Sequence, residues 1–216
     1  MQHSLGPDFV ESDTFAFERR LMAQGRKVVA GVDEAGRGPL AGPVVAACVV
    51  LPLACDFAIF RDSKQLSAIA RARLRDELLR IGARVGIGIV PAAEIDRLNI
   101  LQASLFAMKK AMEALPVTPD FLLVDGKFPV PVAVAQQPLV KGDSRSASIS
   151  AASIVAKVTR DELMEEFHHR FPQYNFRKHK GYPTAEHRQA IRTHGPCPIH
   201  RRSFKGVAEF FGQGHE

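Results

Sequence analysis

The sequence predicts an α/β fold: a mixed β-sheet flanked by helices, with a small C-terminal helical lobe. Three observations favour this fold. Runs rich in valine and alanine at residues 27–33 and 44–51 predict two strands joined by a glycine- and proline-rich turn. Later strand-like runs alternate with segments of helical periodicity, which is typical of a sheet covered by helices. The chain has 216 residues, 46% of them hydrophobic, which is enough for one domain with a substantial core.

Further strands are expected later in the chain. Residues 84–90 alternate apolar side chains with glycine, a pattern that predicts a strand. Residues 121–124 are a short apolar run that predicts a buried strand ending at Asp125. The Pro-rich stretch at residues 128–138 is expected to form a short strand pair or a loop.

Helical periodicity and capping residues predict the helices. Ser67 is a typical N-cap, and apolar residues at helical spacing follow it to about residue 81. The helix expected over residues 148–171 starts with small side chains such as Ala152, which would let it lie close to the sheet. The other helices are expected over residues 15–25, 91–98, 100–115, 184–193 and 203–211.

The composition excludes several classes of protein. No run approaches the roughly 18 uncharged apolar residues of a membrane span, so no membrane association is expected. The N-terminal residues lack a basic-then-apolar signal pattern, which predicts a cytoplasmic location. The cysteines are odd in number and scattered, so reduced thiols are expected at Cys48, Cys55 and Cys197. We expect a monomer, and nothing in the sequence identifies a protein partner.

Periodicity and charge divide the chain into three segments. Residues 1–14 lack periodicity and predict a loose N-terminal extension. Residues 15–171 contain the predicted sheet and its helices, and residues 172–216 form a basic helical segment. Between Arg177 and Lys205, eight Lys or Arg residues stand against one acid, which gives +7 in a chain of net charge +6. Such a segment is typical of a surface that binds a polyanion, and the alternative is a solvated basic helix face.

Four acids are the strongest candidates for chemistry. Asp33 and Glu34 end the first predicted strand, where ionised side chains are costly unless something compensates them. Asp125 ends a later strand, and Asp143 precedes the long helix. If the strands are neighbours, the four carboxylates could hold two Mg²⁺ or Mn²⁺ ions for phosphoryl displacement. Taken alone, Asp125 could instead be a turn residue before glycine, and Asp143 a helix-start acid.

The turn after the first strand is a candidate phosphate-binding loop. The turn of Gly36, Arg37 and Gly38 does not match the dinucleotide fingerprint, because its last glycine spacing differs and it leads into a strand. No Gly-Lys-Ser/Thr follows, which excludes a P-loop. Exposed amides in such a turn suit a sugar-phosphate backbone, and a merely structural hairpin turn is the alternative. Ser63 and Lys64 could contact phosphate or could form a polar loop.

Two further features lie in the basic segment. Tyr182 could stack on a sugar or base. His194, Cys197 and His200, with His187 as a fourth ligand, are spaced closely enough to suggest zinc. Prolines on both sides of the cysteine and the lack of a second cysteine make this interpretation the weaker one.

These motifs, taken together, resemble one enzyme family. Residues 31–44, Gly-Val-Asp-Glu-Ala-Gly-Arg-Gly-Pro-Leu-Ala-Gly-Pro-Val, are similar to the opening motif of ribonuclease HII nearly residue for residue. Shorter matches follow at residues 62–66, 123–126, 141–143, 150–161, 179–184, 194–196 and 200–204. The resemblance covers residues 15–204, with one minor departure: Cys197 stands where the family usually has a small hydroxylated residue, which further weakens the zinc interpretation.

The resemblance implies a ribonuclease H-like fold and an activity. The family cleaves the RNA strand of RNA–DNA hybrids endonucleolytically, including single ribonucleotides embedded in duplex DNA, and leaves 5′-phosphate and 3′-hydroxyl ends. This activity would belong to ribonucleotide excision repair. We hypothesise that one metal ion activates the attacking water while a second stabilises the departing 3′ oxygen. On this basis residues 15–171 would be the catalytic domain, and residues 172–216 would complete the substrate groove.

The resemblance also assigns roles residue by residue. The metal-binding catalytic acids would be Asp33, Glu34, Asp125 and Asp143. The glycine turn would contact the ribose 2′-hydroxyl and adjacent phosphates, and Tyr182 would pack on the sugar beside the scissile position. The expected substrate-binding residues are Gly36, Arg37, Gly38, Ser63, Lys64 and Tyr182.

Three alternatives remain open at this point. A non-catalytic module that binds hybrids or DNA would not need clustered acids near a polyanion. A nuclease of the same fold could cut all-DNA duplex. The related ribonuclease HIII shares the fold, but it normally lacks the Gly-Arg-Gly turn and adds a long N-terminal domain.

Overall fold

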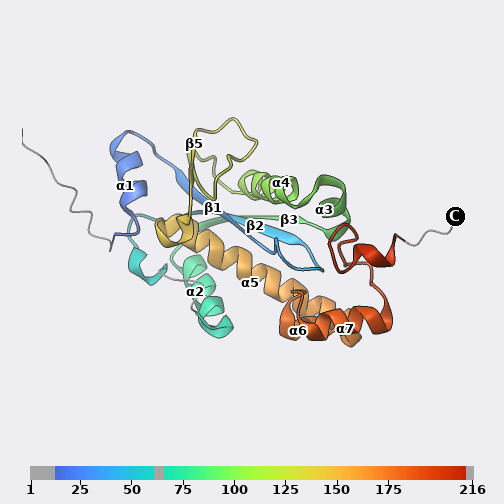
Figure 1. The fold of residues 1–216 in the computed structure, drawn as a ribbon. Coiled ribbons are helices and arrows are strands. Elements are labelled where there is room, and N and C mark those ends of the chain that lie inside the picture. Colours follow the sequence, from blue (N-terminus) through green and yellow to red (C-terminus); the bar gives the residue numbers. More distant parts are fainter. Residues whose placement is uncertain (1–12, 61–65, 213–216) are drawn as a thin grey trace, which may run out of the picture.

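A five-stranded mixed sheet forms the centre of the protein (Figure 1). The computed structural model describes residues 13–60 and 66–212. The strand order is β3-β2-β1-β4-β5, with β1 antiparallel to β2 and parallel to β4. The predicted mixed sheet is therefore confirmed. Its strands are β1 (Val29–Ala35), β2 (Val44–Val50), β3 (Arg84–Val90), β4 (Phe121–Asp125) and β5 (Gln136–Leu139).

Helices cover both faces of this sheet (Figure 1). Side chains of β2 alternate between two cores: Ala46 and Cys48 pack in the cluster that contains α4, and Ala47 and Val49 in the cluster that contains α5. Burial on both faces explains why this strand is apolar throughout. The helices of the body are α1 (Ala16–Ala23), α2 (Ala68–Arg80), α3 (Ala92–Leu98), α4 (Ile100–Glu113) and α5 (Ala147–Arg170).

The long helix α5 lies close against β1, as its small residues predict. A side chain at Gly31 would overlap the backbone of Ser148, so glycine is required at this crossing. The start of the helix is capped by Ser146, whose hydroxyl accepts from the N–H of Ile149 at 3.2 Å. The buried carboxylate of Glu18 accepts from the Ser146 hydroxyl at 2.6 Å, which connects α1 to the helix start.

A small helical lobe follows α5. It comprises α6 (Phe176–His179) and α7 (Ala185–His194), and its core contains Phe176 and Ile191 together with Leu40 of the connection between β1 and β2. The lobe therefore packs directly on the glycine-rich connection. No helix among the described residues combines the length and the apolar content needed to cross a bilayer.

The structure differs from the sequence-based expectations at several positions. The first strand continues through Ala35, residues 128–138 contribute to the single strand β5, and α6 was not predicted. The helix expected over residues 203–211 is wrong, because only Ala208–Phe210 form a short 3-10 helix. Gly206, in the middle of this range, has a φ of +98°, which lies outside the helical region and interrupts the segment.

Candidate active site

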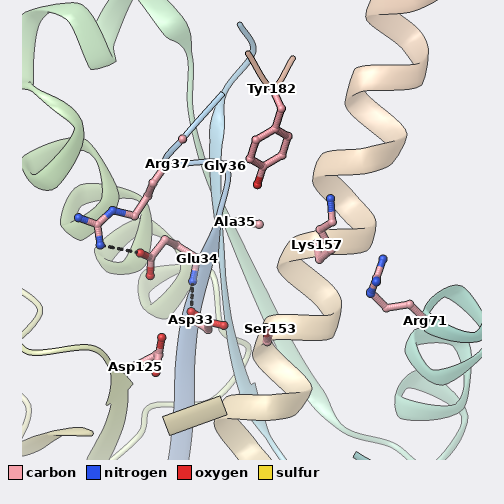
Figure 2. Close-up of a pocket in the computed structure, with 11 residues that line it drawn as sticks. Asp33, Glu34, Ala35, Gly36, Arg37, Arg71, Asp125, Ser153, Lys157 and Tyr182 are labelled. Atoms are coloured by element: carbon pink, nitrogen blue, oxygen red, sulfur yellow. Dashed lines mark hydrogen bonds and ion pairs between the residues drawn. The ribbon is translucent and has the colours of Figure 1, made fainter. Parts of the chain in front are cut away.

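Three of the four predicted acids lie together at one edge of the sheet (Figure 2). Asp33 and Glu34 lie near the carboxyl end of β1, and Asp125 is the last residue of β4, its parallel neighbour. Because Val32 is in register with Val124 on the parallel strand, the next residues, Asp33 and Asp125, lie side by side. All three acids line a cleft of about 380 Å³. The expected convergence of the strand-end acids on neighbouring strands is therefore observed.

Each of these carboxylates has a different partner. Asp33 Oδ1 accepts from the N–H of Glu34 at 2.7 Å. Glu34 Oε1 lies 3.2 Å from Arg37 Nη1, and Asp125 Oδ1 accepts from the N–H of Gly142 at 2.7 Å. Within residues 13–60 and 66–212 no three His, Cys, Asp or Glu side chains are grouped closely enough to hold a metal ion.

The electrostatics of the cluster are unfavourable without a cation. Burial raises the pKa of Asp33 well above its usual range, and the carboxylates of Glu34 and Asp125 raise it further. Burial also raises the pKa of Glu34, although Arg37 opposes that shift. Asp33 is only 5% exposed, so water screens its charge poorly.

The donor set fits a hard divalent cation. Carboxylate oxygens are preferred ligands of Mg²⁺ and Mn²⁺, whereas zinc favours nitrogen and sulfur ligands. Arg37 lowers the pKa of Glu34, whereas burial and the neighbouring carboxylates raise the pKa of Asp33. For Glu34 to bind an ion, its carboxylate would turn away from Arg37.

Asp33→Asn is expected to raise the melting temperature in EDTA at about pH 8. An acid whose pKa is raised by folding ionises more readily in the unfolded state, so its contribution to stability falls as the pH rises above the unfolded-state pKa. Asparagine keeps the Oδ1 acceptor and removes the charge. Calorimetry should show a larger gain at about pH 8 than at about pH 4. A lower melting temperature for the variant at the higher pH would contradict this account.

Asp143 lies near the other acids without reaching the cleft. It belongs to the 3-10 turn Gly142–Ser144 and is 8% exposed. The N–H of its neighbour Gly142 donates to Asp125 Oδ1, and this hydrogen bond connects the turn to the end of β4. Asp143 is not among the described residues that line the cleft, and its role as a fourth ligand stays a prediction.

The other walls of the cleft carry the glycine turn, an aromatic ring and two cations (Figure 2). Tyr182 is 43% exposed, and its ring points into the cleft between the turn and α5. Arg71 of α2 and Lys157 of α5 were not predicted as site residues. Lys157 lies inside the matched stretch at residues 150–161, which could have indicated it, whereas nothing distinguishes Arg71 from the other arginines of α2.

The predicted basic surface is smaller than its composition suggests. Arg201 is fully buried, and Arg177 and Lys178 pair with Glu165 and Glu186 at 2.6 and 2.8 Å. Part of the positive charge of this segment is therefore buried or paired with acids and is not available as free surface charge. Ser63 and Lys64 lie outside the described residues, so their expected phosphate contacts stay predictions.

The histidines of the lobe form a structural chain. His187 Nε2 lies 3.0 Å from His200 Nε2, and His187 Nδ1 lies 2.9 Å from the carbonyl oxygen of Tyr182. Burial lowers the pKa of both histidines to about 4, so they are neutral at physiological pH. Cys197 Sγ lies 3.1 Å from His200 Nδ1, and all three cysteine thiols are free. The zinc interpretation with His194 finds no support in the described part of the chain.

Comparison with known proteins gives consistent matches. A sequence model of the family described as Ribonuclease HII matches residues 30–207. Ribonuclease HII of Desulfotalea psychrophila is 56% identical over 201 residues, which cover 92% of this chain and 89% of that protein. Ribonuclease HII of Geobacter sulfurreducens is 52% identical over 197 residues, 91% of each chain. The ribonuclease H2 structure from Pyrococcus horikoshii OT3 has a TM-score of 0.72 at 27% identity and covers 85% of this chain and 97% of that one.

The matched range spans the strand-end acids, the glycine turn and Tyr182. The structural likeness confirms the ribonuclease H-like fold that the motifs implied. High identity to two relatives over about nine-tenths of the chain confirms the resemblance read from the sequence. The chain therefore belongs to the ribonuclease HII family and is an endoribonuclease of the ribonuclease H type.

Proposed function

We propose that this enzyme hydrolyses the RNA strand of RNA–DNA hybrids and also cuts at single ribonucleotides embedded in duplex DNA, leaving 5′-phosphate and 3′-hydroxyl ends. One observation carries the proposal. Three buried or half-buried carboxylates share a cleft with a glycine turn, a partly exposed tyrosine and two cations. The acids could bind metal ions that assist attack on a phosphodiester. The glycine turn and the tyrosine ring could contact the sugar next to that phosphodiester.

The metal ligands in this proposal are Asp33, Glu34, Asp125 and Asp143. Bound Mn²⁺ or Mg²⁺, two ions during catalysis, would supply an activated water and neutralise charge on the departing 3′ oxygen. Asp33 would be a deeply placed ligand, since only 5% of it is exposed. Glu34 would exchange Arg37 for metal, which would release the guanidinium toward a phosphate.

Substrate contacts are proposed for the remaining walls. The turn Gly36, Arg37 and Gly38 would contact the 2′-hydroxyl, the group that distinguishes RNA from DNA at one position. Arg71 and Lys157 would contact phosphates of the same strand. Phosphate contacts are proposed for Ser63 and Lys64 as well, which lie outside the described residues.

Residues 172–216 would complete the groove for the hybrid or ribonucleotide-containing duplex, a role supported by Tyr182, which lines the cleft together with residues of the 15–171 segment. A monomer in the cytoplasm remains part of the proposal, and residues 1–12 of the expected N-terminal extension lie outside the described residues.

The direct test is cleavage of a labelled DNA duplex that contains one ribonucleotide. We expect a single cut with Mn²⁺ or Mg²⁺ and none in EDTA, and a continuous RNA–DNA hybrid should also be cut. All-DNA duplex is the control. Tight binding without cleavage would indicate a binding module, and cleavage of the all-DNA duplex would indicate a DNA nuclease.

Tyr182→Ala is expected to lower cleavage at a single ribonucleotide more than cleavage of a continuous hybrid. Only the former requires the RNA–DNA junction to be held at one sugar. For comparison, stacking of a base on an aromatic ring contributes about 1–3 kcal/mol. The ratio of kcat/KM for the two substrates measures the effect, and Tyr182→Phe separates the ring from its hydroxyl. Equal losses on both substrates would argue against a junction-sensing role.

A further inference from the structure

Two fully buried arginines lie beneath the glycine-rich connection between β1 and β2. Arg160 of α5 and Arg201 beyond α7 are each 0% exposed. Burial lowers the pKa of Arg160 to about 10 and that of Arg201 to about 9. Neither guanidinium forms an ion pair with a carboxylate in residues 13–60 and 66–212. Their partners are instead backbone carbonyl oxygens.

The two arginines hold different parts of the backbone. Arg201 donates from Nη2 to Gly36 O at 2.5 Å and from Nη1 to Arg37 O at 2.9 Å. It also reaches the carbonyls of Gly42 and Pro43 at 3.0 and 3.2 Å. Arg160 shares Pro43 O but otherwise binds the carbonyls of Ala41 and Lys180, both at 3.0 to 3.1 Å.

A purely structural account leaves this arrangement poorly explained. Burying a cation without an anion is costly, and apolar packing often stabilises a fold equally well. What a guanidinium provides and an apolar side chain does not is a rigid fork of donors that fixes several carbonyl directions at once. The two guanidinium groups therefore fix the geometry of the turn.

Fixing the two turn carbonyls also fixes two amides. The structure has no cis peptide bond among its described residues, so each C=O points opposite to the N–H of the next residue. With the carbonyls of Gly36 and Arg37 directed at buried Arg201, the N–H groups of Arg37 and Gly38 point away from the interior. Neither N–H takes part in the hydrogen bonds among described residues, and both residues line the cleft.

We infer that Arg201 is a positioning residue, which orients the N–H groups of Arg37 and Gly38 as a pair of donors for acceptor oxygens on the ribonucleotide in the cleft. Arg201 itself touches no substrate in this arrangement. Pre-oriented amides need no reorganisation when the substrate arrives, which is why their direction affects the rate as well as the binding. The inference rests on the proposed function, because that function supplies the ligand.

The test compares Arg201→Lys with Arg160→Lys. Both variants keep a buried cation and lose the fork, but only the first loses the bonds to the Gly36 and Arg37 carbonyls. We expect Arg201→Lys to lower kcat/KM at a single ribonucleotide by about 10²-fold, the loss typical of removing one pre-oriented donor. Its preference for binding ribonucleotide-containing over all-DNA duplex in EDTA should fall as well. Arg160→Lys should show a comparable fall in melting temperature and a smaller loss of preference.

The outcomes separate the two proposals. If the wild-type enzyme fails to cut the single-ribonucleotide duplex, the proposed function is wrong. If it cuts and folded Arg201→Lys retains the wild-type preference and rate, the role of Arg201 is overturned. Losses that match in both variants and follow their melting temperatures would also overturn it, since they would indicate a structural role alone.

The wild-type protein provides a second measurement should Arg201→Lys fail to fold. In EDTA, the ¹⁵N–¹H signals of Arg37 and Gly38 are expected to shift on adding duplex with one ribonucleotide, and to shift less with all-DNA duplex. The amides of Gly25 and Gly82, remote from the cleft lining, serve as controls. Unchanged Arg37 and Gly38 signals under saturating ribonucleotide duplex would overturn the inference.

Discussion

Asp125→Asn is expected to abolish cleavage while leaving the binding of hybrid intact. The variant removes one proposed metal ligand from the carboxyl end of β4 but preserves the acceptor that receives the N–H of Gly142. We expect kcat to fall by at least about 10²–10³-fold, the range found when one group that stabilises transition-state charge is removed. Binding in EDTA should be equal or slightly tighter, because one negative charge near the polyanion is lost.

The same substitution at the opposite end of β4 provides the control. The carboxylate of Asp120 accepts from the N–H groups of Lys27 and Val28, far from the cleft lining. Asp120→Asn should therefore retain wild-type cleavage. Gel assays with Mn²⁺ measure kcat, and fluorescence anisotropy measures the dissociation constant. Cleavage by Asp125→Asn at a rate near that of the wild type would remove this acid from the catalytic set.

Gly36→Ala is expected to impair both folding and activity. Gly36 has a φ of +100°, and an added Cβ would overlap the Arg160 side chain and approach Pro43 O to 2.7 Å. The backbone strain alone costs about 1–3 kcal/mol, and the overlap adds to it. We expect a lower melting temperature and a loss of cleavage that exceeds the loss of hybrid binding, since the turn would shift from the acids.

Substitutions at two further glycines separate the effect of backbone strain from the effect of steric overlap. Gly25 has a similar φ of +90° with nothing within 4 Å of an added Cβ, so Gly25→Ala isolates the strain at a remote position. At Gly38 an added Cβ would meet only Tyr182 Cε1, at an ordinary 3.6 Å, so Gly38→Ala should keep its stability. It should still weaken substrate binding, because the methyl group enters the cleft. If Gly36→Ala matched Gly25→Ala in stability and the wild type in activity, the close packing at the turn would be unimportant.

Local signals account for the elements that the sequence predicted well. The alternation at residues 84–90 and the N-cap Ser67 each act within a few residues, and both were observed as expected. The pairing of Asp33 with Asp125 was also predictable, because acids at the ends of apolar strands meet if the strands are parallel neighbours. The helix expected over residues 203–211 failed because Gly206 takes a φ of +98°, a conformation that the apolar spacing does not indicate. The start of the segment is instead held by Asp96, which lies over a hundred positions earlier.

The amino-acid sequence by itself determined the strands, the acids at their ends, the glycine turn and the family, since each depends on neighbouring residues or on contiguous motifs. Only the tertiary structure decided which cations face the cleft and which are buried. Arg201 and Arg202 are adjacent in the chain, yet the first lies beneath the glycine turn and the second is exposed. Burial depends on contacts with residues far away in the sequence, and no local pattern encodes those contacts.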